Sequence, residues 1–246
     1  MVEIDNLCLK YPGDENSILE NVCLEIGEGE CVLLTGESGS GKSSIINSVN
    51  GLSTRYDGCE YSGDIFINGE NTDGLPLYEI SKMVSSVFQN PKTYFFNVDT
   101  TLELLFFLEN IGISREEMKK RLDDMLEVFL IEHLLDRDIF RLSGGEKQIL
   151  CVAATYISGS SFIVLDEPSS NLDEKYTLIL ADMLKKLKAE GITILIAEHR
   201  IYYLMDIVDR VMFIKDGQIK REFTGDEFSS LSKKTLYDMG GKEYFK

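Results

Sequence analysis

A glycine-rich loop between a predicted strand and a predicted helix constrains the fold of this chain most strongly. It follows the apolar run 31–34, precedes an apolar-periodic stretch, and consists of Gly36, Glu37, Ser38, Gly39, Ser40, Gly41, Lys42 and Ser43. Its glycines allow backbone N–H groups to converge on phosphate oxygens, and the following helix adds its positive dipole end. Lys42 supplies a cation for the outer phosphates, and the Ser43 hydroxyl is a ligand for Mg²⁺. Because a chance glycine-rich turn would lack the flanking strand and helix, the pattern predicts a site for nucleotide phosphates.

Two carboxylates, Asp166 and Glu167, end the short apolar run 162–165. That run is too short for a helix and too apolar for an exposed strand, so it predicts a central parallel strand. Open α/β sheets bind ligands at the carboxyl ends of their strands, where successive side chains point to opposite sides. We therefore assign Asp166 to Mg²⁺, through a bound water, and Glu167 to polarisation of the attacking water. The alternative, an acidic helix cap before Pro168, would explain one carboxylate more easily than both.

A second candidate phosphate site, the segment from Leu142 to Glu146, also opens a predicted helix. One nucleotide does not easily require both sites from the same chain. We therefore predict that the second site serves the nucleotide of a partner, which favours a paired ATPase over a solitary kinase.

The formal net charge of -17 limits the partners of this 246-residue chain. Phosphate contacts need clustered Lys and Arg, so the charge argues against nucleic acid, and it also disfavours adsorption onto anionic lipid. No secretory signal and no run of about 18 uncharged apolar residues is visible, so we expect a soluble chain without direct membrane insertion. Any connection to a membrane should run through a protein partner. The five cysteines lack a C-x-x-C pair and are expected to be reduced core thiols of a cytosolic protein.

The order of predicted elements gives the fold class. Short strands at 2–9, 22–26 and 63–68 favour an amino-terminal antiparallel layer, and the segment 100–157 is helical without a convincing strand. A helix at 174–189, a strand at 192–197, a short helix and a strand at 208–214 then continue an α/β alternation. We predict one α/β domain, 1–246, of the P-loop NTPase (RecA-like) class. Its parallel-sheet core and antiparallel β layer take up about 1–89 and 158–246, and an inserted α-helical subdomain takes up about 90–157.

The run Leu142-Ser143-Gly144-Gly145-Glu146-Lys147-Gln148 resembles the signature motif of ATP-binding cassette (ABC) ATPases. It lies between the phosphate loop and the Asp166-Glu167 pair, and the match covers nearly the whole chain because further motifs follow in the family's order. The resemblance implies that each ATP lies between one cassette's phosphate loop and the signature helix of another. Ser143, Gly144, Gly145 and Glu146 would then face the partner's nucleotide. One departure is Ile149, where many family members carry a basic residue after the glutamine.

Five other positions take their roles from this resemblance, and His199 takes its role also from its place after a predicted strand. Tyr11 is similar to the aromatic residue that stacks on adenine, although a core tyrosine at a strand end is the alternative. Gln89 resembles the glutamine that reaches Mg²⁺ and the attacking water, and His199 resembles the histidine that contacts the terminal phosphate. Asp173 ends the segment 170–173, which is similar to the loop that crosses between paired chains, and Ser44 completes the implied nucleotide-binding set. The implied cofactors are ATP and Mg²⁺.

Within the family, the segments 88–100 and 198–200 look most like the ATPases of energy-coupling-factor (ECF) importers, which take up vitamins or transition-metal ions. The resemblance implies a peripheral location at the cytoplasmic face of the membrane, with integral membrane subunits docked in a groove around Gln89 to Glu109. Asp99, Glu103 and Glu109 could receive basic residues of a membrane subunit there, or could form an ordinary solvated acidic face.

Two other functions remain as alternatives to the ATPase subunit of an importer. A non-transport cassette ATPase acting as a conformational switch would predict a long coiled coil, a basic face or two fused cassettes. The chain has no sustained heptads, a net charge of -17 and a single phosphate loop. A P-loop kinase would not need the second phosphate-binding helix. The sequence does not decide whether the favoured ATPase pairs with itself or with a related chain.

Overall fold

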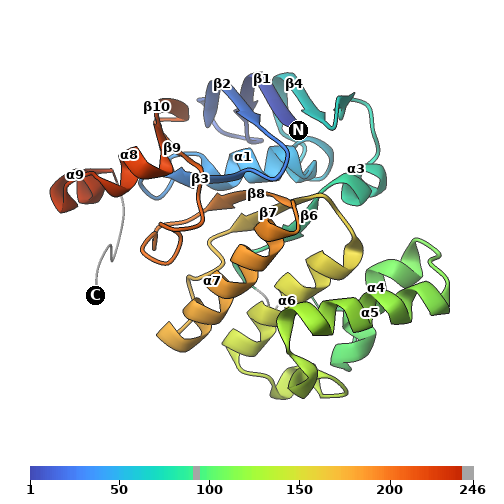
Figure 1. Cartoon of the computed structure of the whole chain (residues 1–246). Helices are drawn as coiled ribbons and strands as arrows, with labels where there is room; N and C mark the ends of the chain where they lie inside the picture. Colours follow the sequence, from blue (N-terminus) through green and yellow to red (C-terminus); the bar gives the residue numbers. More distant parts are fainter. Residues whose placement is uncertain (91–94, 240–246) are drawn as a thin grey trace.

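Two β-sheets and the helices around them make up the computed structural model, which describes residues 1–90 and 95–239 (Figure 1). The strands are β1 (Val2–Lys10), β2 (Leu19–Ile26), β3 (Cys31–Thr35), β4 (Glu60–Ile67), β5 (Glu70–Asn71), β6 (Ser85–Val87), β7 (Phe162–Asp166), β8 (Thr193–Ala197), β9 (Arg210–Lys215) and β10 (Gln218–Thr224). The helices are α1 (Lys42–Val49), α2 (Leu52–Arg55), α3 (Leu77–Met83), α4 (Thr100–Asn110), α5 (Arg115–Phe129), α6 (Gly144–Ser158), α7 (Glu174–Ala189), α8 (Gly225–Ser229) and α9 (Lys233–Asp238), with 3₁₀ turns η2 (Glu132–Leu134) and η3 (Ile139–Arg141).

The larger sheet has the strand order β10-β9-β3-β8-β7-β6 and is parallel except for the β9–β10 hairpin. Every residue of β3 and β8 is buried, as expected for apolar strands covered on both faces. Ala197 at the end of β8 lies opposite Leu34 of β3 and Asp166 of β7. The carboxyl ends of these three strands therefore meet at one edge, where the phosphate loop and the two carboxylates follow.

The smaller sheet is antiparallel, with the order β2-β1-β4-β5. Strand β1 buries Ile4 and Leu7, which would face opposite sides in a regular strand. Asn6 adopts φ +50°, and the pairing shifts register between Ile4 and Leu7, so both side chains reach the core. Gly63 on β4 makes room for this irregularity, because a Cβ atom there would clash with the carbonyl oxygens of Asp5 and Asn6. Strand β1 therefore continues from Val2 to Lys10 with a local irregularity at Asn6.

Helix α1 lies between the two sheets (Figure 1). Its buried residues Ile45, Ile46 and Val49 share one apolar core with β1 and β2 of the smaller sheet and with β3 and β8 of the larger one. The other face of the larger sheet is covered by α6 and α7, which belong to a second core. Packing on both sides fixes α1, and with it the first turn that carries Lys42 and Ser43.

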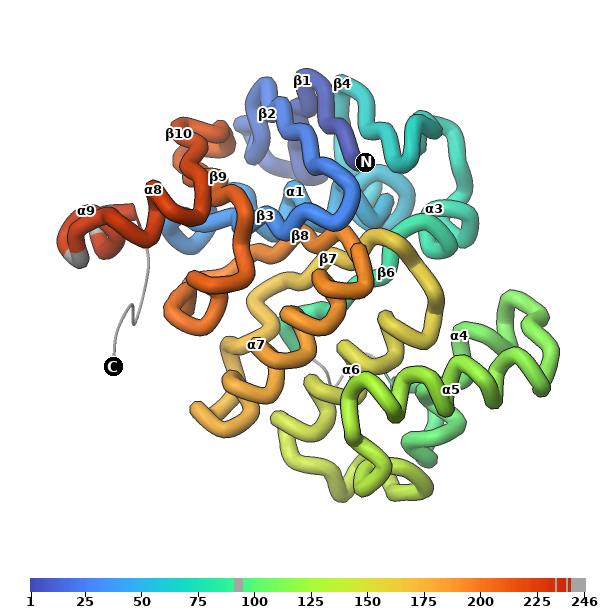
Figure 2. Tube along the Cα trace, viewed as in Figure 1, coloured from blue at the N-terminus to red at the C-terminus, as the bar shows by residue number. Residues whose placement is uncertain are grey.

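Between β6 and β7 the chain leaves the larger sheet, forms α4, α5 and α6, and then returns (Figure 2). Helix α4 begins after Asp99, whose side chain accepts a hydrogen bond from the backbone N–H of Leu102 (3.0 Å). Such a cap satisfies a backbone donor that the helix itself cannot satisfy. The predicted fold class is confirmed: a parallel-sheet core, an antiparallel amino-terminal layer and a helical segment between two strands of the core.

The structure differs from the sequence-based expectation after β8. Residues 202–207 form consecutive turns instead of the predicted short helix. The N–H of Leu204 donates to Ile201 (3.0 Å) and the N–H of Ile207 to Leu204 (2.8 Å), each across three residues rather than the four of an α-helix. The short elements α2, α3, β6, α8 and α9 are not predictable from the sequence, because each has too few residues to show a hydrophobic period.

Candidate active site

The phosphate loop joins β3 to α1 at the carboxyl edge of the larger sheet. Gly36 has no room for a side chain, because a Cβ atom would clash with the carbonyl oxygen of Ile214. Gly41 adopts φ +108° directly before α1, a conformation that favours glycine. Lys42 is buried, and its Nζ donates to the carbonyl oxygens of Gly36 (3.0 Å) and Glu37 (2.9 Å). The loop therefore curls around the Lys42 ammonium group.

The predicted metal ligands Ser43 and Asp166 lie side by side. The Ser43 hydroxyl donates to Asp166 Oδ1 across 3.0 Å, which links the first turn of α1 to the end of β7. Burial raises the pKa of the Asp166 carboxyl above its ordinary value of 3.8, while the hydrogen bond from Ser43 acts in the opposite direction. A hydroxyl oxygen and a carboxylate oxygen are donors that Mg²⁺ prefers, so these two residues fit a magnesium site.

Glu167 lies between two polar side chains that come from neighbouring strands. Gln89, which follows β6, donates from Nε2 to Glu167 Oε2 (2.8 Å), and His199 Nε2, which follows β8, lies 3.2 Å from Glu167 Oε1. Glu167 itself has φ +43°, a conformation that is uncommon for a residue with a side chain. Residues in such conformations cluster at active sites, although turns also use them. The structure thus brings the three predicted catalytic residues together.

Tyr11 and Ser44 also lie at this edge. The Tyr11 hydroxyl is 3.3 Å from Ser44 Oγ, so the half-buried ring lies beside the first turn of α1. Of the loop residues between β3 and α1, Glu37, Ser38 and Gly39 are exposed and Ser40 is buried. The stacking of Tyr11 on adenine remains a prediction.

The signature residues form a second group, at the start of α6. The N–H of Glu146 donates to Ser143 Oγ (3.2 Å), and the N–H of Ser143 donates to Glu146 Oε2 (2.7 Å), which together make a capping box. Glu146 Oε1 also pairs with Arg137 (3.0 Å). These bonds give Glu146 a structural role at the start of α6. The contact of Glu146 with a nucleotide remains a prediction.

The two signature glycines differ in their surroundings. A Cβ atom on Gly145 would clash with the ring of Tyr176 on α7, whereas a Cβ atom on Gly144 would meet nothing within 4 Å. Asp173 caps α7 by accepting from the N–H of Tyr176 (2.9 Å). The signature helix and the segment that ends at Asp173 are therefore fixed against each other through one aromatic ring.

Glu198, the first residue after β8, has a role that was not expected from the sequence. Its side chain is 1% exposed, and its carboxylate accepts hydrogen bonds from Ser169, Tyr203 and the backbone that follows it. Burial and the nearby Glu198 charge raise the pKa of the Tyr203 hydroxyl well above its ordinary value. One feature of the sequence could have indicated this role: Glu198 is a charged residue directly after a buried strand and directly before His199.

Comparison with known proteins identifies the family of this chain. A family model described as ABC transporter matches residues 19–170, which is more than half of the sequence. The chain belongs to the ABC transporter family. Residues 36–43 and 166–167 of the cluster described above lie within the matched part, whereas His199 follows it.

Relatives of this ABC cassette extend the match beyond the family model. A Treponema denticola protein assigned as an ABC transporter ATP-binding protein is 42% identical over 239 residues, which are 97% of this chain and 49% of that protein. A Saccharolobus solfataricus protein with the same assignment, SSO2030, is 36% identical over 97% of this chain and 45% of its own length. The chain thus spans about half the length of these curated relatives.

Two solved structures share the fold of this ABC cassette. The structure of cbiO1 from Clostridium perfringens, described as part of the ABC transporter complex cbiONQ, has a TM-score of 0.82 and 26% identity, and the match covers 93% of this chain and 90% of that one. The cassette MJ0796, a dimer in a post-hydrolysis state bound to ADP and Pi, has a TM-score of 0.77 and 29% identity over 91% of this chain and 98% of that one.

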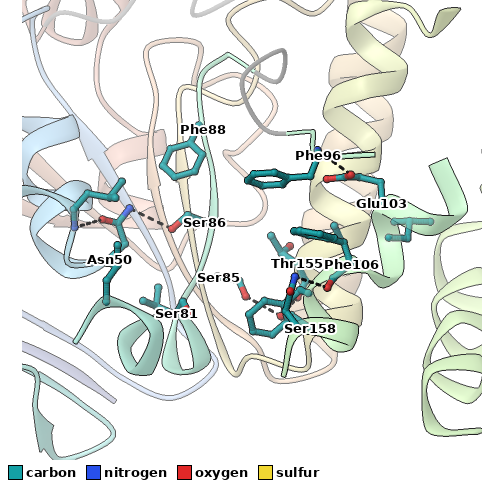
Figure 3. Close-up of a pocket in the computed structure, with 17 residues that line it drawn as sticks. Asn50, Ser81, Ser85, Ser86, Phe88, Phe96, Glu103, Phe106, Thr155 and Ser158 are labelled. Atoms are coloured by element: carbon teal, nitrogen blue, oxygen red, sulfur yellow. Dashed lines mark hydrogen bonds between the residues drawn. The ribbon is translucent and has the colours of Figure 1, made fainter. Parts of the chain in front are cut away.

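The cassette has a groove of about 360 Å³ between its core and its helical segment (Figure 3). It is lined by Asn50, Leu52, Leu77, Ser81, Val84, Ser85, Ser86, Phe88, Phe96, Glu103, Leu104, Phe106, Phe107, Asn110, Ala154, Thr155 and Ser158. Phe96 is 76% exposed and stacks on Phe106, with ring centroids 4.9 Å apart. The groove overlaps the predicted docking region from Gln89 to Glu109 within the described residues, and its walls are mainly apolar and aromatic.

The expected acidic contacts in this groove need correction. Glu103 is buried, and its Oε2 accepts from the N–H groups of Phe96 (3.1 Å) and Asn97 (2.7 Å) and from the Asn97 side chain (3.1 Å). It holds the chain segment before α4 instead of presenting a free charge to a partner, and Asp99 is occupied as the cap of α4. Of the three acidic residues, Glu109 is the one with an exposed side chain. Lys92 and its neighbours at 91–94 lie outside the described residues.

Among residues 1–90 and 95–239, no helix combines the length and the apolar character that a membrane crossing requires.

All five cysteines are free, and Cys31, Cys59 and Cys151 are buried. Burial raises the pKa of Cys31 to about 12, which makes its thiolate a minor species at neutral pH.

Proposed function

We propose that this chain is the ATP-binding and ATP-hydrolysing subunit of a membrane importer of the ECF type, for a vitamin or a transition-metal ion. The observation that carries the proposal is the convergence of Gln89 and His199 on Glu167, beside the Ser43–Asp166 pair. A site that only bound nucleotide would need no such carboxylate. The similarity to cbiO1, part of the ABC transporter complex cbiONQ, supports the transport role, and the motifs at 88–100 and 198–200 support the ECF type.

Mg²⁺ would be held by Ser43 Oγ, by Asp166 through a bound water, and by the side-chain oxygen of Gln89. When bound, it would neutralise charge on the phosphates and on the reacting oxygens. Lys42 and the backbone N–H groups from Gly39 to Ser44 would hold the phosphates, because they lie where β3 ends and α1 begins. Tyr11 would support the adenine ring.

Glu167 would accept a hydrogen bond from the attacking water and orient it toward the terminal phosphate. The contacts with Gln89 (2.8 Å) and His199 (3.2 Å) hold its two oxygens from opposite sides. His199 would also contact the terminal phosphate. The position of its side chain beside Glu167 would therefore depend on whether a triphosphate is bound. These roles for the single residues belong to the proposal.

Two cassettes would act together, as in the dimeric structure of MJ0796. Ser143, Gly144 and Gly145 of one cassette would present hydroxyl and N–H groups to the terminal phosphate held by the other, and the segment ending at Asp173 would cross between them. ATP favours the closed pair because only the triphosphate joins both halves, and hydrolysis removes that link. Integral membrane subunits would bind in the apolar groove and hold the cassette at the cytoplasmic face of the membrane. Closing and opening of the cassette pair would move these subunits.

The hydrolytic role is tested by replacing Glu167 with Gln, which keeps the shape and removes the charge. We expect the rate of phosphate release to fall by at least about 100-fold, the scale of a lost general base, with ATP affinity retained. Glu190→Gln, the same change at the exposed far end of α7, serves as the control and should hydrolyse ATP like the wild type. Normal phosphate release by Glu167→Gln would contradict the assignment.

The transport role is tested by purifying the chain from the membranes of its native cells and identifying the proteins that accompany it. We expect an integral membrane scaffold subunit and a small substrate-binding membrane subunit. Recovery only with ribosomes or DNA would contradict transport and favour the non-transport switch. A phosphorylated small-molecule product would favour a kinase.

A further inference from the structure

The carboxylate of Glu198 lies behind the candidate active site and joins two segments that are far apart in the sequence. Its Oε2 accepts from the N–H of Ser169 (3.2 Å), from Ser169 Oγ (2.7 Å) and from the hydroxyl of Tyr203 (2.9 Å). Its Oε1 accepts from the N–H groups of His199 (2.7 Å) and Arg200 (3.0 Å). At 1% exposure, this side chain has no access to solvent that could replace a lost partner.

Both segments lead directly to catalytic residues. Ser169 follows Glu167 by two positions and lies in the turn 168–171, which leads to Asp173. Arg200 strengthens the same connection, since its Nη1 donates to the carbonyl oxygens of Leu172 (3.0 Å) and Ser169 (3.4 Å). The backbone of Glu198 is in turn bound to the strand before the phosphate loop, where its N–H donates to Leu34 (3.2 Å).

We propose that Glu198 is a positioning residue that couples the segment 169–173 to His199, so that the partner-facing loop and the histidine can move only together. A partner cassette that engages this loop would thereby set the distance between His199 and Glu167. The inference rests on the proposed function, because it concerns the hydrolysis step of the same site.

The chemistry of the five donors requires a carboxylate at this position. Three of them are backbone N–H groups, which can only donate. A glutamine could offer one acceptor oxygen, and its NH₂ group would face either the N–H of Ser169 or those of His199 and Arg200. Whichever way the amide turned, at least one buried backbone donor would lose its partner, and the link between the two segments would break on that side.

The test uses steady-state ATP hydrolysis by the full chain in its membrane-extracted complex. For Glu198→Gln we expect kcat to fall about tenfold or more, the scale of one buried donor left unpaired, while KM for ATP stays within about twofold of the wild type. Glu30→Gln is the matched control, because Glu30 also accepts hydrogen bonds, from the N–H of Gly27 (2.8 Å) and from Arg210 (3.1 Å), but lies before β3 at the opposite end of the strand. Its kcat should equal that of the wild type.

Ser169→Ala and Tyr203→Phe each remove one hydroxyl donor and serve if Glu198→Gln does not fold. Each should lower kcat with KM unchanged. In the double variant, Ser169→Ala should add little to the loss caused by Glu198→Gln, since both break the same link. Unchanged kcat in the folded variants, a parallel change in KM, or additive losses in the double variant would overturn the inference. A wild-type complex without ATPase activity would instead refute the proposed function.

Discussion

At the scale of single residues, Glu146 stabilises the start of α6 through hydrogen bonds that depend on its charge. The N–H of Ser143 holds the pKa of this carboxyl below its ordinary value of 4.5, and Arg137 acts in the same direction. A lowered pKa in the folded state means that the stabilisation is complete above pH 4.5 and is lost as the pH falls through the folded-state pKa. Glu146→Gln should therefore lower the free energy of unfolding at neutral pH, and the difference from the wild type should shrink below pH 4.5.

Denaturant unfolding of both proteins between neutral pH and pH 3 measures this difference. The exposed Glu127 on α5 provides the control, since Glu127→Gln should show no comparable pH-dependent difference. A gap between Glu146→Gln and the wild type that stays constant into acid would contradict the role of the charge.

Several residues of the candidate site could be predicted from the sequence because their chemistry is local. The phosphate loop needs its glycines and Lys42 in one short run, and Asp166 and Glu167 are neighbours at the end of one strand. Glu198 and Glu103 could not be assigned in this way, because their roles depend on folding. Ser169 is 29 positions from Glu198, and the partners of Glu103 are at 96–97, in a loop whose path no periodicity reveals.

At the scale of elements, the long segments were predictable and the short ones were not. The helix expected at 174–189 has those bounds as α7, and the strand expected at the apolar run 31–34 is β3. Three-residue β6 carries no pattern of its own and is a strand because it pairs with β7. The turns at 202–207 replace a predicted helix, since apolar residues at helical spacing can also be buried in turns.

The first turn of α6 gives a prediction at the element scale. Gly145→Ala should destabilise the fold by about 1–3 kcal/mol, because the new methyl group would press on the Tyr176 ring and force α6 and α7 apart. Gly144→Ala is a matched control one position earlier, where a methyl group meets open space. Its effect on the free energy of unfolding should stay within about 0.5 kcal/mol. Equal unfolding midpoints for the two variants would contradict the packing argument.

At the scale of the whole molecule, the two groups of site residues occupy different parts of the fold. The phosphate loop, Asp166 and Glu167 lie at the edge of the larger sheet, whereas Ser143, Gly144 and Gly145 open a helix of the segment between β6 and β7. The groove between the core and the helical segment is mainly apolar and aromatic. The binding of a partner there would depend on shape and burial more than on charge. Because the phosphate loop and the signature helix lie in different parts of the fold, we predict that two cassettes are needed to enclose each ATP.

The most direct measurement counts cassettes in particles that carry the Glu167→Gln variant. The complex is extracted from membranes with either ATP or ADP, and its composition is determined by native mass spectrometry. We predict two cassettes with ATP retained between them, and their separation or loss of nucleotide with ADP. Particles that bind ATP but hold a single cassette, in both the membrane extract and the purified chain, would contradict the shared site.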